Sequence, residues 1–325
     1  MTEYRQVGMS GLTVSTVGLG CNNLGRTGSV TATQEGSDAV VHAALDAGIT
    51  LFDVADMYGS FPGQSETMLA KALGNERENV IVATKFGLDA GGANGVDWGR
   101  RGSRKYILQS VEASLRRLGT DYIDLYYYHS PDPLTSIAET LATMDELVTA
   151  GKVRYLGHSN MAGWQISQAE FTARMAGGNR FVASQNHYNL LDRRAELEVT
   201  AAAEAFGLGV MPYYPLANGL LTGKYSSGKA PEGSRLTYTR EHMLAGADLA
   251  QLHQLGTFAA DRGLTEVQVA FSWLAAQPSV ASVIAGATRP EQVSENALAA
   301  SWKPTEEDLA RLDEIFPSTA RVALF

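Results

Sequence analysis

The feature that most constrains the fold is a repeated alternation of short apolar runs with longer helical patterns. The apolar runs predict strands at residues 17–20, 50–53, 80–84, 122–128, 153–156, 181–185, 209–213 and 280–284. The helical patterns lie at residues 33–47, 65–73, 104–118, 137–150, 163–175, 194–206, 247–262, 267–276, 291–300 and 304–315. Strands that alternate with helices in this way favour a parallel α/β fold.

The number of units and the first turn distinguish a closed sheet from an open one. Eight strand–helix units fit a (β/α)8 TIM barrel, whereas an open dinucleotide-binding sheet usually carries G-x-G-x-x-G after its first strand. Here Gly18-Leu19-Gly20 runs into Cys21-Asn22-Asn23 and lacks that turn. We therefore expect a single barrel domain over 1–325, preceded by an N-terminal β-hairpin at 4–15 and interrupted by a long loop at 215–245.

Charge and cysteine content narrow the class of partner. The chain has 26 Lys and Arg against 35 Asp and Glu, a net charge of −9, which argues against nucleic acid or an anionic membrane surface as the main partner. The single cysteine, Cys21, cannot form an internal disulfide. No apolar run has the length of a signal or membrane segment. These features predict a cytoplasmic protein that acts on a small molecule; they leave the oligomeric state open.

Polar side chains follow the carboxyl ends of the predicted strands, which is where TIM barrels carry their active sites. They are Asp53, Lys85, His129, Ser159, Asn160, Gln185 and Tyr213, with Tyr58 on the loop that begins at Asp53. Each residue type has an ordinary structural alternative, such as a helix cap for Asp53, a solvated position for Lys85 or a turn brace for His129. Convergence on one rim favours a shared site, because independent structural roles need not share a rim.

Four of these side chains suit the protonation of a carbonyl oxygen. A tyrosine phenol, with a pKa of about 10, keeps its proton at neutral pH and can donate it. We expect the Lys85 ammonium to stabilise the Tyr58 phenolate and lower the pKa of Tyr58, with Asp53 holding the lysine in place. A neutral His129 can hydrogen-bond the substrate oxygen. A proton donor, a charge that stabilises its conjugate base and a group that orients the oxygen together suit the transfer of a hydride to a carbonyl carbon.

A metal-dependent barrel hydrolase would need clustered ligands. The histidines are His42, His129, His158, His187, His242 and His253. They do not form a set with ligand spacing, and no carboxylates accompany them at the usual separations. No metal site is therefore expected.

Several segments, in order along almost the whole chain, resemble the aldo-keto reductase superfamily. They are Asp53-Val54-Ala55-Asp56-Met57-Tyr58-Gly59, Thr84-Lys85-Phe86-Gly87, His129-Ser130-Pro131-Asp132, Gly157-His158-Ser159-Asn160, Gln185, Tyr188-Asn189-Leu190-Leu191-Asp192, Tyr213-Tyr214-Pro215-Leu216, Leu221-Thr222-Gly223-Lys224-Tyr225 and 286–296. The resemblance is greatest to the bacterial and potassium-channel β-subunit-like branches.

The resemblance implies NADPH-dependent reduction of an aldehyde or ketone to an alcohol. It implies that Tyr58 is the general acid, that Lys85 and Asp53 tune it, and that His129 orients the carbonyl. It also implies that Ser159, Asn160 and Gln185 bind the nicotinamide carboxamide, that Tyr213 stacks on the ring, and that Pro215, Leu216 and Lys224 lie on a loop covering the cofactor.

The segment 288–291 reads as a helix start, with Thr288 as N-cap and Pro290 in the first turn. Helix N-termini attract phosphate, and Arg289 adds a permanent charge. The resemblance places the adenosine phosphate here, with Gln292, Glu295 and Asn296 near the adenine. Gly286 and Gln292 stand where many family members carry Lys and Arg, so recognition of the 2′-phosphate, and with it NADP over NAD, falls to Arg289.

The substrate and the direction of the reaction stay open. Met57, Phe61, Trp98, Tyr128 and residues 86–103 are candidates for an apolar substrate wall. Arg100, Arg101 and Arg104 either meet an acidic substrate or lie on a solvated loop; we favour the loop. Two other functions fit the same site: NADP-dependent oxidation of a sugar or pyridoxine-type alcohol, and a regulatory nucleotide-binding role like that of a channel β-subunit.

Overall fold

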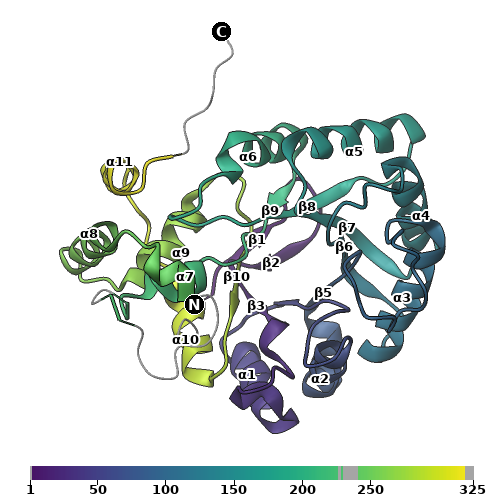
Figure 1. Ribbon diagram of the computed structural model, residues 1–325, viewed down its shortest axis with the longest axis horizontal. Coiled ribbons are helices and arrows are strands. Elements are labelled where there is room, and N and C mark those ends of the chain that lie inside the picture. Colours follow the sequence, from purple (N-terminus) through teal and green to yellow (C-terminus); the bar gives the residue numbers. More distant parts are fainter. Residues whose placement is uncertain (1, 226–227, 230–240, 319–325) are drawn as a thin grey trace.

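The computed structural model describes residues 2–225, 228–229 and 241–318. Its centre is a parallel sheet of eight strands in the order β10-β3-β4-β5-β6-β7-β8-β9, with the helices outside it (Figure 1). The strands are β3 (Val17–Gly20), β4 (Leu51–Asp53), β5 (Ile81–Phe86), β6 (Ile123–Tyr128), β7 (Val153–Ser159), β8 (Phe181–Gln185), β9 (Gly209–Val210) and β10 (Val283–Gly286). The predicted (β/α)8 architecture is confirmed.

The sheet closes on itself at the segment that precedes β10. Val210 and Val280 form a parallel bridge, and the backbone N–H groups of Ala281 and Ile284 donate to the carbonyls of Val210 and Pro212 at 2.9 and 3.0 Å. Two predicted boundaries shift as a result: β9 is shorter than 209–213, and β10 begins at Val283 instead of residue 280.

The helices lie close to their predicted positions. They are α1 (Gln34–Asp46), α2 (Gln64–Leu73), α3 (Arg104–Leu118), α4 (Ile137–Thr149), α5 (Gly163–Ala176), α6 (Ala195–Phe206), α7 (Glu241–Ala245), α8 (Leu249–Ala260), α9 (Glu266–Ala276), α10 (Pro290–Ala299) and α11 (Glu306–Ile315). Capping side chains define several starts: Ser136 accepts from the Glu139 N–H, and Thr265 and Gln268 form a reciprocal capping box.

The segment predicted as one long loop at 215–245 carries structure at both ends. A 3₁₀ segment, η4 (Ala217–Thr222), follows β9, and α7 lies at the other end. Residues 226–227 and 230–240 of that predicted loop lie outside the described residues.

The predicted hairpin is present and covers one end of the barrel. Strands β1 (Tyr4–Gln6) and β2 (Thr13–Ser15) pair antiparallel, and Val7, Leu12 and Val14 join the cluster of buried side chains inside the barrel. The hairpin turn lies against the residues that precede β9: a Cβ on Gly8 would be 2.2 Å from the Gly207 carbonyl oxygen. Gly8 also has φ +56°, a conformation that favours glycine. The site must therefore use the other end of the barrel.

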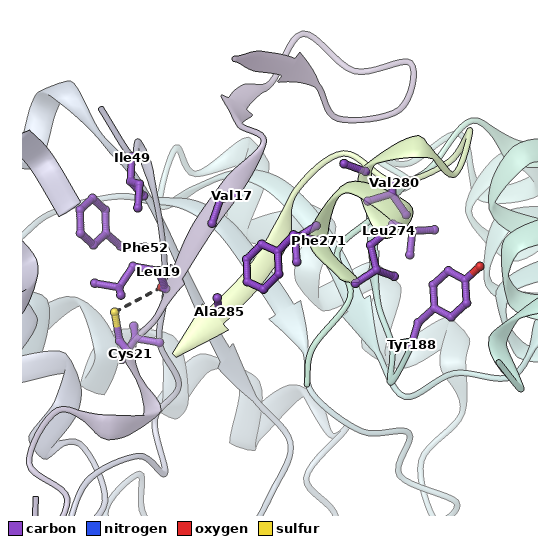
Figure 2. Close-up of a cluster of buried hydrophobic side chains, with 14 of the residues drawn as sticks. Val17, Leu19, Cys21, Ile49, Phe52, Tyr188, Phe271, Leu274, Val280 and Ala285 are labelled. Carbon is purple, nitrogen blue, oxygen red and sulfur yellow. Dashed lines mark hydrogen bonds between the residues drawn. The ribbon is translucent and has the colours of Figure 1, made fainter. Parts of the chain in front are cut away.

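The alternation of side chains along each strand decides which residues reach the barrel interior. Leu51, Ala83, Leu125 and Ala183 belong to the inner cluster, whereas Phe52 packs in the outer layer between the strands and helices (Figure 2). Because successive side chains alternate between faces, residues two positions beyond the inner-cluster members also point inward, now at the carboxyl ends. That rule brings Asp53, Lys85 and Gln185 together at the mouth.

Candidate active site

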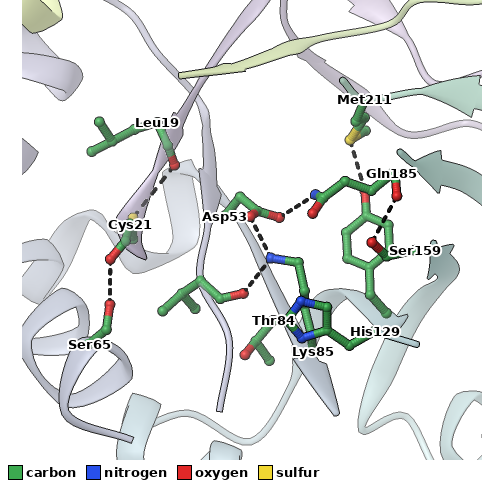
Figure 3. Close-up of polar contacts among 12 residues, drawn as sticks. Leu19, Cys21, Asp53, Ser65, Thr84, Lys85, His129, Ser159, Gln185 and Met211 are labelled. Atoms are coloured by element: carbon green, nitrogen blue, oxygen red, sulfur yellow. Dashed lines mark hydrogen bonds and ion pairs between the residues drawn. The ribbon is translucent and has the colours of Figure 1, made fainter. Parts of the chain in front are cut away.

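An ion pair forms the base of the site. The Lys85 Nζ lies 2.5 Å from Asp53 Oδ1 and donates to the Val54 carbonyl at 2.9 Å (Figure 3). The lysine side chain is fully buried and that of Asp53 is 5% exposed. Burial opposes the ammonium, but the charge and hydrogen bond of Asp53 and the proximity of Tyr58 outweigh it and raise the pKa of Lys85. The lysine therefore stays charged at neutral pH.

Tyr58 lies on the β4–α2 loop, next to this pair. The Lys85 Nζ is 5.1 Å from the centroid of its ring. Burial raises the pKa of Tyr58, the Lys85 charge lowers it, and the net change is upward. Lys85 thus lowers the pKa of Tyr58 as expected, but burial of the phenol outweighs this contribution. The phenol is protonated at neutral pH.

His129 follows β6 and meets Tyr58 edge to face, with ring centroids 6.1 Å apart. The side chain is buried, and burial together with the Lys85 charge holds the pKa of His129 well below its ordinary value. The imidazole is therefore neutral. Within the described chain, its buried Nδ1 has no hydrogen-bond partner.

The predicted carboxamide-binding residues form a connected cluster beside the pair. Asn160, in a left-handed conformation with φ 59°, donates to the His129 carbonyl and to Ser159 Oγ at 2.9 and 3.0 Å. The Tyr213 hydroxyl donates to Asn160 Oδ1 at 2.7 Å, and its ring stacks on His187. Gln185 Nε2 donates to Asp53 Oδ2 at 2.8 Å. The cluster and the ion pair are thus in direct contact.

The far end of the site is more open. Arg289 and Lys224 are exposed, and Lys224 lies across Gly219, where a Cβ would meet its Nζ at 3.3 Å. The predicted Thr288 cap is wrong: Arg289 is the N-cap of α10, with Pro290 as the first helical residue. Gln292 Oε1 instead accepts from the Thr288 N–H at 2.9 Å, which still holds the start of α10 in place.

One cavity of about 960 Å³ connects the two ends. Of the predicted site residues, it is lined by Asp53, Tyr58, His129, Ser159, Asn160, Gln185, Tyr213, Pro215, Leu216, Lys224, Gly286, Thr288, Arg289, Gln292, Glu295 and Asn296. Lys85 lies beneath the surface. Sequence reasoning missed Asn22, Asn23 and Arg26, which also line the cavity. These three residues closely follow the first barrel strand, and this position is the sequence feature that could have identified them.

The predicted substrate wall is only partly right. Met57 lines the cavity, joined by Leu88. Phe61 and Trp98 are exposed elsewhere, and Tyr128 packs against Phe86 in the core, with ring centroids 5.2 Å apart. None of these three lines the cavity.

Arg100 and Arg101, on the loop before α3, and Arg104, the first residue of α3, contact other residues of the chain. Arg101 pairs with Asp97 and Asp89 at 2.5 and 3.0 Å, and Arg104 pairs with Glu146. Arg100 donates to the Leu134 carbonyl at 2.8 Å. These contacts favour the solvated-loop interpretation over recognition of an acidic substrate.

A buried polar network that the sequence did not reveal supports the Tyr58 loop from behind. Asn94 donates to Asp56 Oδ2 at 2.6 Å and accepts from Arg117 at 3.1 Å. Arg117 also pairs with Glu66 at 2.5 Å, and Glu66 accepts from Thr84, the neighbour of Lys85, at 2.7 Å. Burial and the charge of Glu66 raise the pKa of Asp56 to about 8. The network therefore ties the backbone segments that carry Tyr58 and Lys85 to α2 and α3.

The described residues offer neither a metal cluster nor a membrane-spanning helix. They contain no group of three or more His, Cys, Asp or Glu side chains placed to hold a metal ion. No helix among them has the length and apolar character needed to cross a membrane.

Comparison with known proteins gives a consistent result. The family model described as "Aldo/keto reductase family" matches residues 16–316. A putative voltage-gated potassium channel subunit beta of Schizosaccharomyces pombe is 36% identical over 97% of this chain and 94% of its own length. An L-glyceraldehyde 3-phosphate reductase of Escherichia coli is 34% identical over 96% of this chain and 92% of its own length.

Proposed function

The chain belongs to the aldo/keto reductase family, and from this premise we propose that it is an NADPH-dependent reductase that converts an aldehyde or ketone to an alcohol. The observation that carries the proposal is the buried Asp53–Lys85 pair beside a protonated Tyr58 and a neutral His129. A family that generally uses a nicotinamide cofactor supports the choice of hydride donor. The reaction is reversible, and the working direction depends on the cellular cofactor ratio.

The residues along the cavity fit such a cofactor. Amide and hydroxyl groups of Asn160, Ser159 and Gln185 suit a carboxamide at one end. At the other end, Arg289, Lys224 and the start of α10 suit phosphate groups. When bound, NADPH supplies the hydride that adds to the carbonyl carbon.

The side chains of the site supply the proton and hold the substrate. Tyr58 hydrogen-bonds the carbonyl oxygen and gives it a proton as the C–O double bond opens, which leaves a phenolate. The positive charge of Lys85 stabilises that phenolate, and Asp53 keeps the ammonium in position. Neutral His129 offers a second hydrogen bond to the same oxygen. Because the Asp53–Lys85 pair is buried away from water, the attraction between the Lys85 ammonium and the phenolate stays strong.

Replacement of Tyr58 by Phe tests the proposal. Tyr58→Phe removes the proton donor and leaves the ring, so kcat for reduction of a panel of aldehydes and ketones should fall by about 10² to 10⁴-fold, while the dissociation constant for NADPH, measured by fluorescence, stays within a few-fold. Tyr4→Phe, an exposed hairpin tyrosine, is the matched control and should match the wild type. Unchanged turnover in Tyr58→Phe would remove the tyrosine from the acid role.

A second candidate is a regulatory nucleotide-binding protein. The observation in its favour is the name of the Schizosaccharomyces pombe relative, a channel subunit beta. It needs nucleotide binding without efficient turnover, whereas the reductase needs both. Tight NADPH binding by the wild type with no activity on any carbonyl or, with NADP, any alcohol of the panel would favour the regulatory role.

A further inference from the structure

Asp53 is held from two sides by side chains that come from different strands. Lys85 of β5 occupies Oδ1 at 2.5 Å, and Gln185 of β8 occupies Oδ2 at 2.8 Å (Figure 3). All three side chains are buried. The orientation of the ion pair therefore depends on Gln185 as well as on Lys85.

The contact with Asp53 also fixes which way the Gln185 amide faces. An ionised carboxylate only accepts hydrogen bonds, so the Gln185 NH₂ group must point to Asp53. Its Oε1 is then left as an acceptor, which suits the NH₂ group of a carboxamide. Ser159 Oγ donates to the Gln185 backbone carbonyl at 2.8 Å, so it contacts the main chain of this residue and not the side-chain amide that meets Asp53.

The floor of the site limits where the Gln185 side chain can go. Tyr127 fills the barrel beneath it and donates to Met211 Sδ at 2.9 Å. Gly157 leaves room for that ring, since a Cβ there would lie 2.5 Å from it. With the barrel interior filled in this way, Gln185 has little freedom to turn away from Asp53.

At the other end of the pair, Lys85 has three N–H donors. Asp53 and the Val54 carbonyl take two of them, and the third is available to the Tyr58 hydroxyl, whose ring centroid is 5.1 Å away. A change in how strongly Asp53 holds Lys85 therefore changes how well Lys85 stabilises the Tyr58 phenolate.

We propose that Gln185 is a positioning residue that couples occupancy of the carboxamide site to the proton on Tyr58, through Asp53 and Lys85. This inference rests on the proposed reductase function. When a cofactor amide hydrogen-bonds Oε1, the Gln185 side chain becomes ordered and its NH₂ group holds Asp53. Asp53 then attracts Lys85 less strongly, so the ammonium is freer to stabilise the Tyr58 phenolate. By linkage, cofactor binding and proton release from Tyr58 favour each other.

The pH profile of kcat tests the coupling. Gln185→Met keeps the side-chain length but removes the hydrogen bond to Asp53 and the acceptor offered to the cofactor carboxamide. The NADPH dissociation constant should therefore rise by roughly tenfold. Because Asp53 then holds Lys85 more strongly, the basic limb of the profile should move upward by about half a pH unit or more. Gln185→Asn, which keeps an amide but cannot reach Asp53, should give the same shift and serves if the Met variant does not fold.

Ser159→Ala is the matched control, since Ser159 lies in the same carboxamide cluster and does not contact Asp53. It should weaken NADPH binding and leave the basic limb in place. A Gln185 variant that weakens binding with no movement of that limb would overturn the coupling, as would an equal movement in Ser159→Ala.

A nuclear magnetic resonance measurement tests the link without turnover. The Gln185 side-chain amide signal, assigned by its loss in Gln185→Met, should shift in Asp53→Asn and again when NADP is added to the wild type. No response to Asp53→Asn would contradict the Gln185–Asp53 contact even in an active enzyme. A response to Asp53→Asn in a protein that neither binds NADP nor reduces carbonyls would instead defeat the proposed function.

Discussion

The two ends of the cavity differ in how deeply their charged side chains are buried. At the catalytic end, Lys85 and Asp53 are 0% and 5% exposed and bound to each other. At the far end Arg289 and Lys224 are exposed, and neither forms an ion pair with any other described residue. Buried charges act strongly and tolerate little change, whereas exposed charges are screened by salt and act mainly as binding groups. The first end should therefore control rate and the second affinity.

The largest expected effect comes from Lys85→Met. It removes the charge that stabilises the Tyr58 phenolate, so kcat should fall by on the order of 10³-fold. It also leaves Asp53 buried without its partner, which should lower the free energy of unfolding by roughly 3 to 5 kcal/mol. Steady-state kinetics and urea unfolding measure the two effects.

Lys71→Met is the control for that variant, because Lys71 is an exposed lysine on α2. It should change the unfolding free energy by less than about 0.5 kcal/mol and leave kcat unchanged. If Lys85→Met were as stable and as active as Lys71→Met, the contrast between a buried and an exposed end would fail.

A smaller effect, confined to affinity, is expected from Arg289→Gln. In the proposed assignment Arg289 binds the 2′-phosphate, and the loss of that charged hydrogen bond should lower kcat/KM for NADPH by roughly 10 to 100-fold, with kcat at saturation and kcat/KM for NADH unchanged. Parallel kinetics with NADPH and NADH at two salt concentrations give the measurement, and the NADPH value of the wild type should be the more sensitive to salt.

Arg116→Gln, at an exposed position on α3, controls for the general loss of positive charge and should alter neither cofactor. An equal loss of NADPH and NADH in Arg289→Gln would place the arginine at a group that both cofactors share. A wild-type preference for NADH would reject the Arg289 assignment altogether.

The catalytic end was the more predictable of the two from the sequence. Asp53, Lys85 and Gln185 lie at strand ends. Each is two residues beyond an inward-facing side chain (Leu51, Ala83 or Ala183), so the alternation points all three into the same mouth of the barrel. The same alternation turns Tyr128 outward while Tyr127 points in. The mistaken placement of Tyr128 in the substrate wall was therefore avoidable.

Contacts between distant segments were not predictable. Gln185 and Asp53 are 132 residues apart, and no local pattern says that their side chains meet. The upward change in the pKa of Tyr58 depends on how deeply the loop is buried, which the sequence does not state. The Arg289 cap is a local case: Pro290 at the first helical position makes the preceding residue the cap.

The smallest expected effect concerns the layer behind the catalytic end. The pKa of Asp56 is raised from 3.8 to about 8 in the folded state, so between these values the folded chain holds a proton that the unfolded chain releases. Stability from this group is present at low pH and lost as pH rises toward 8. Asp56→Asn mimics the protonated carboxyl and removes this dependence. The unfolding free energy of the variant relative to the wild type should therefore rise by on the order of 1 kcal/mol between pH 6 and pH 7.

Chemical denaturation across that pH range measures the difference, and a constant offset would contradict a protonated Asp56. Asp97→Asn is the matched control, because Asp97 lies in the exposed loop and contacts with the Gly99 N–H and Arg101 lower its pKa. Its folded state holds no extra proton near neutral pH, so its offset from the wild type should stay constant there. A pH-dependent difference in Asp56→Asn alone would locate the abnormal titration in the buried layer that supports Tyr58, and would separate that layer from the exposed surface of the barrel.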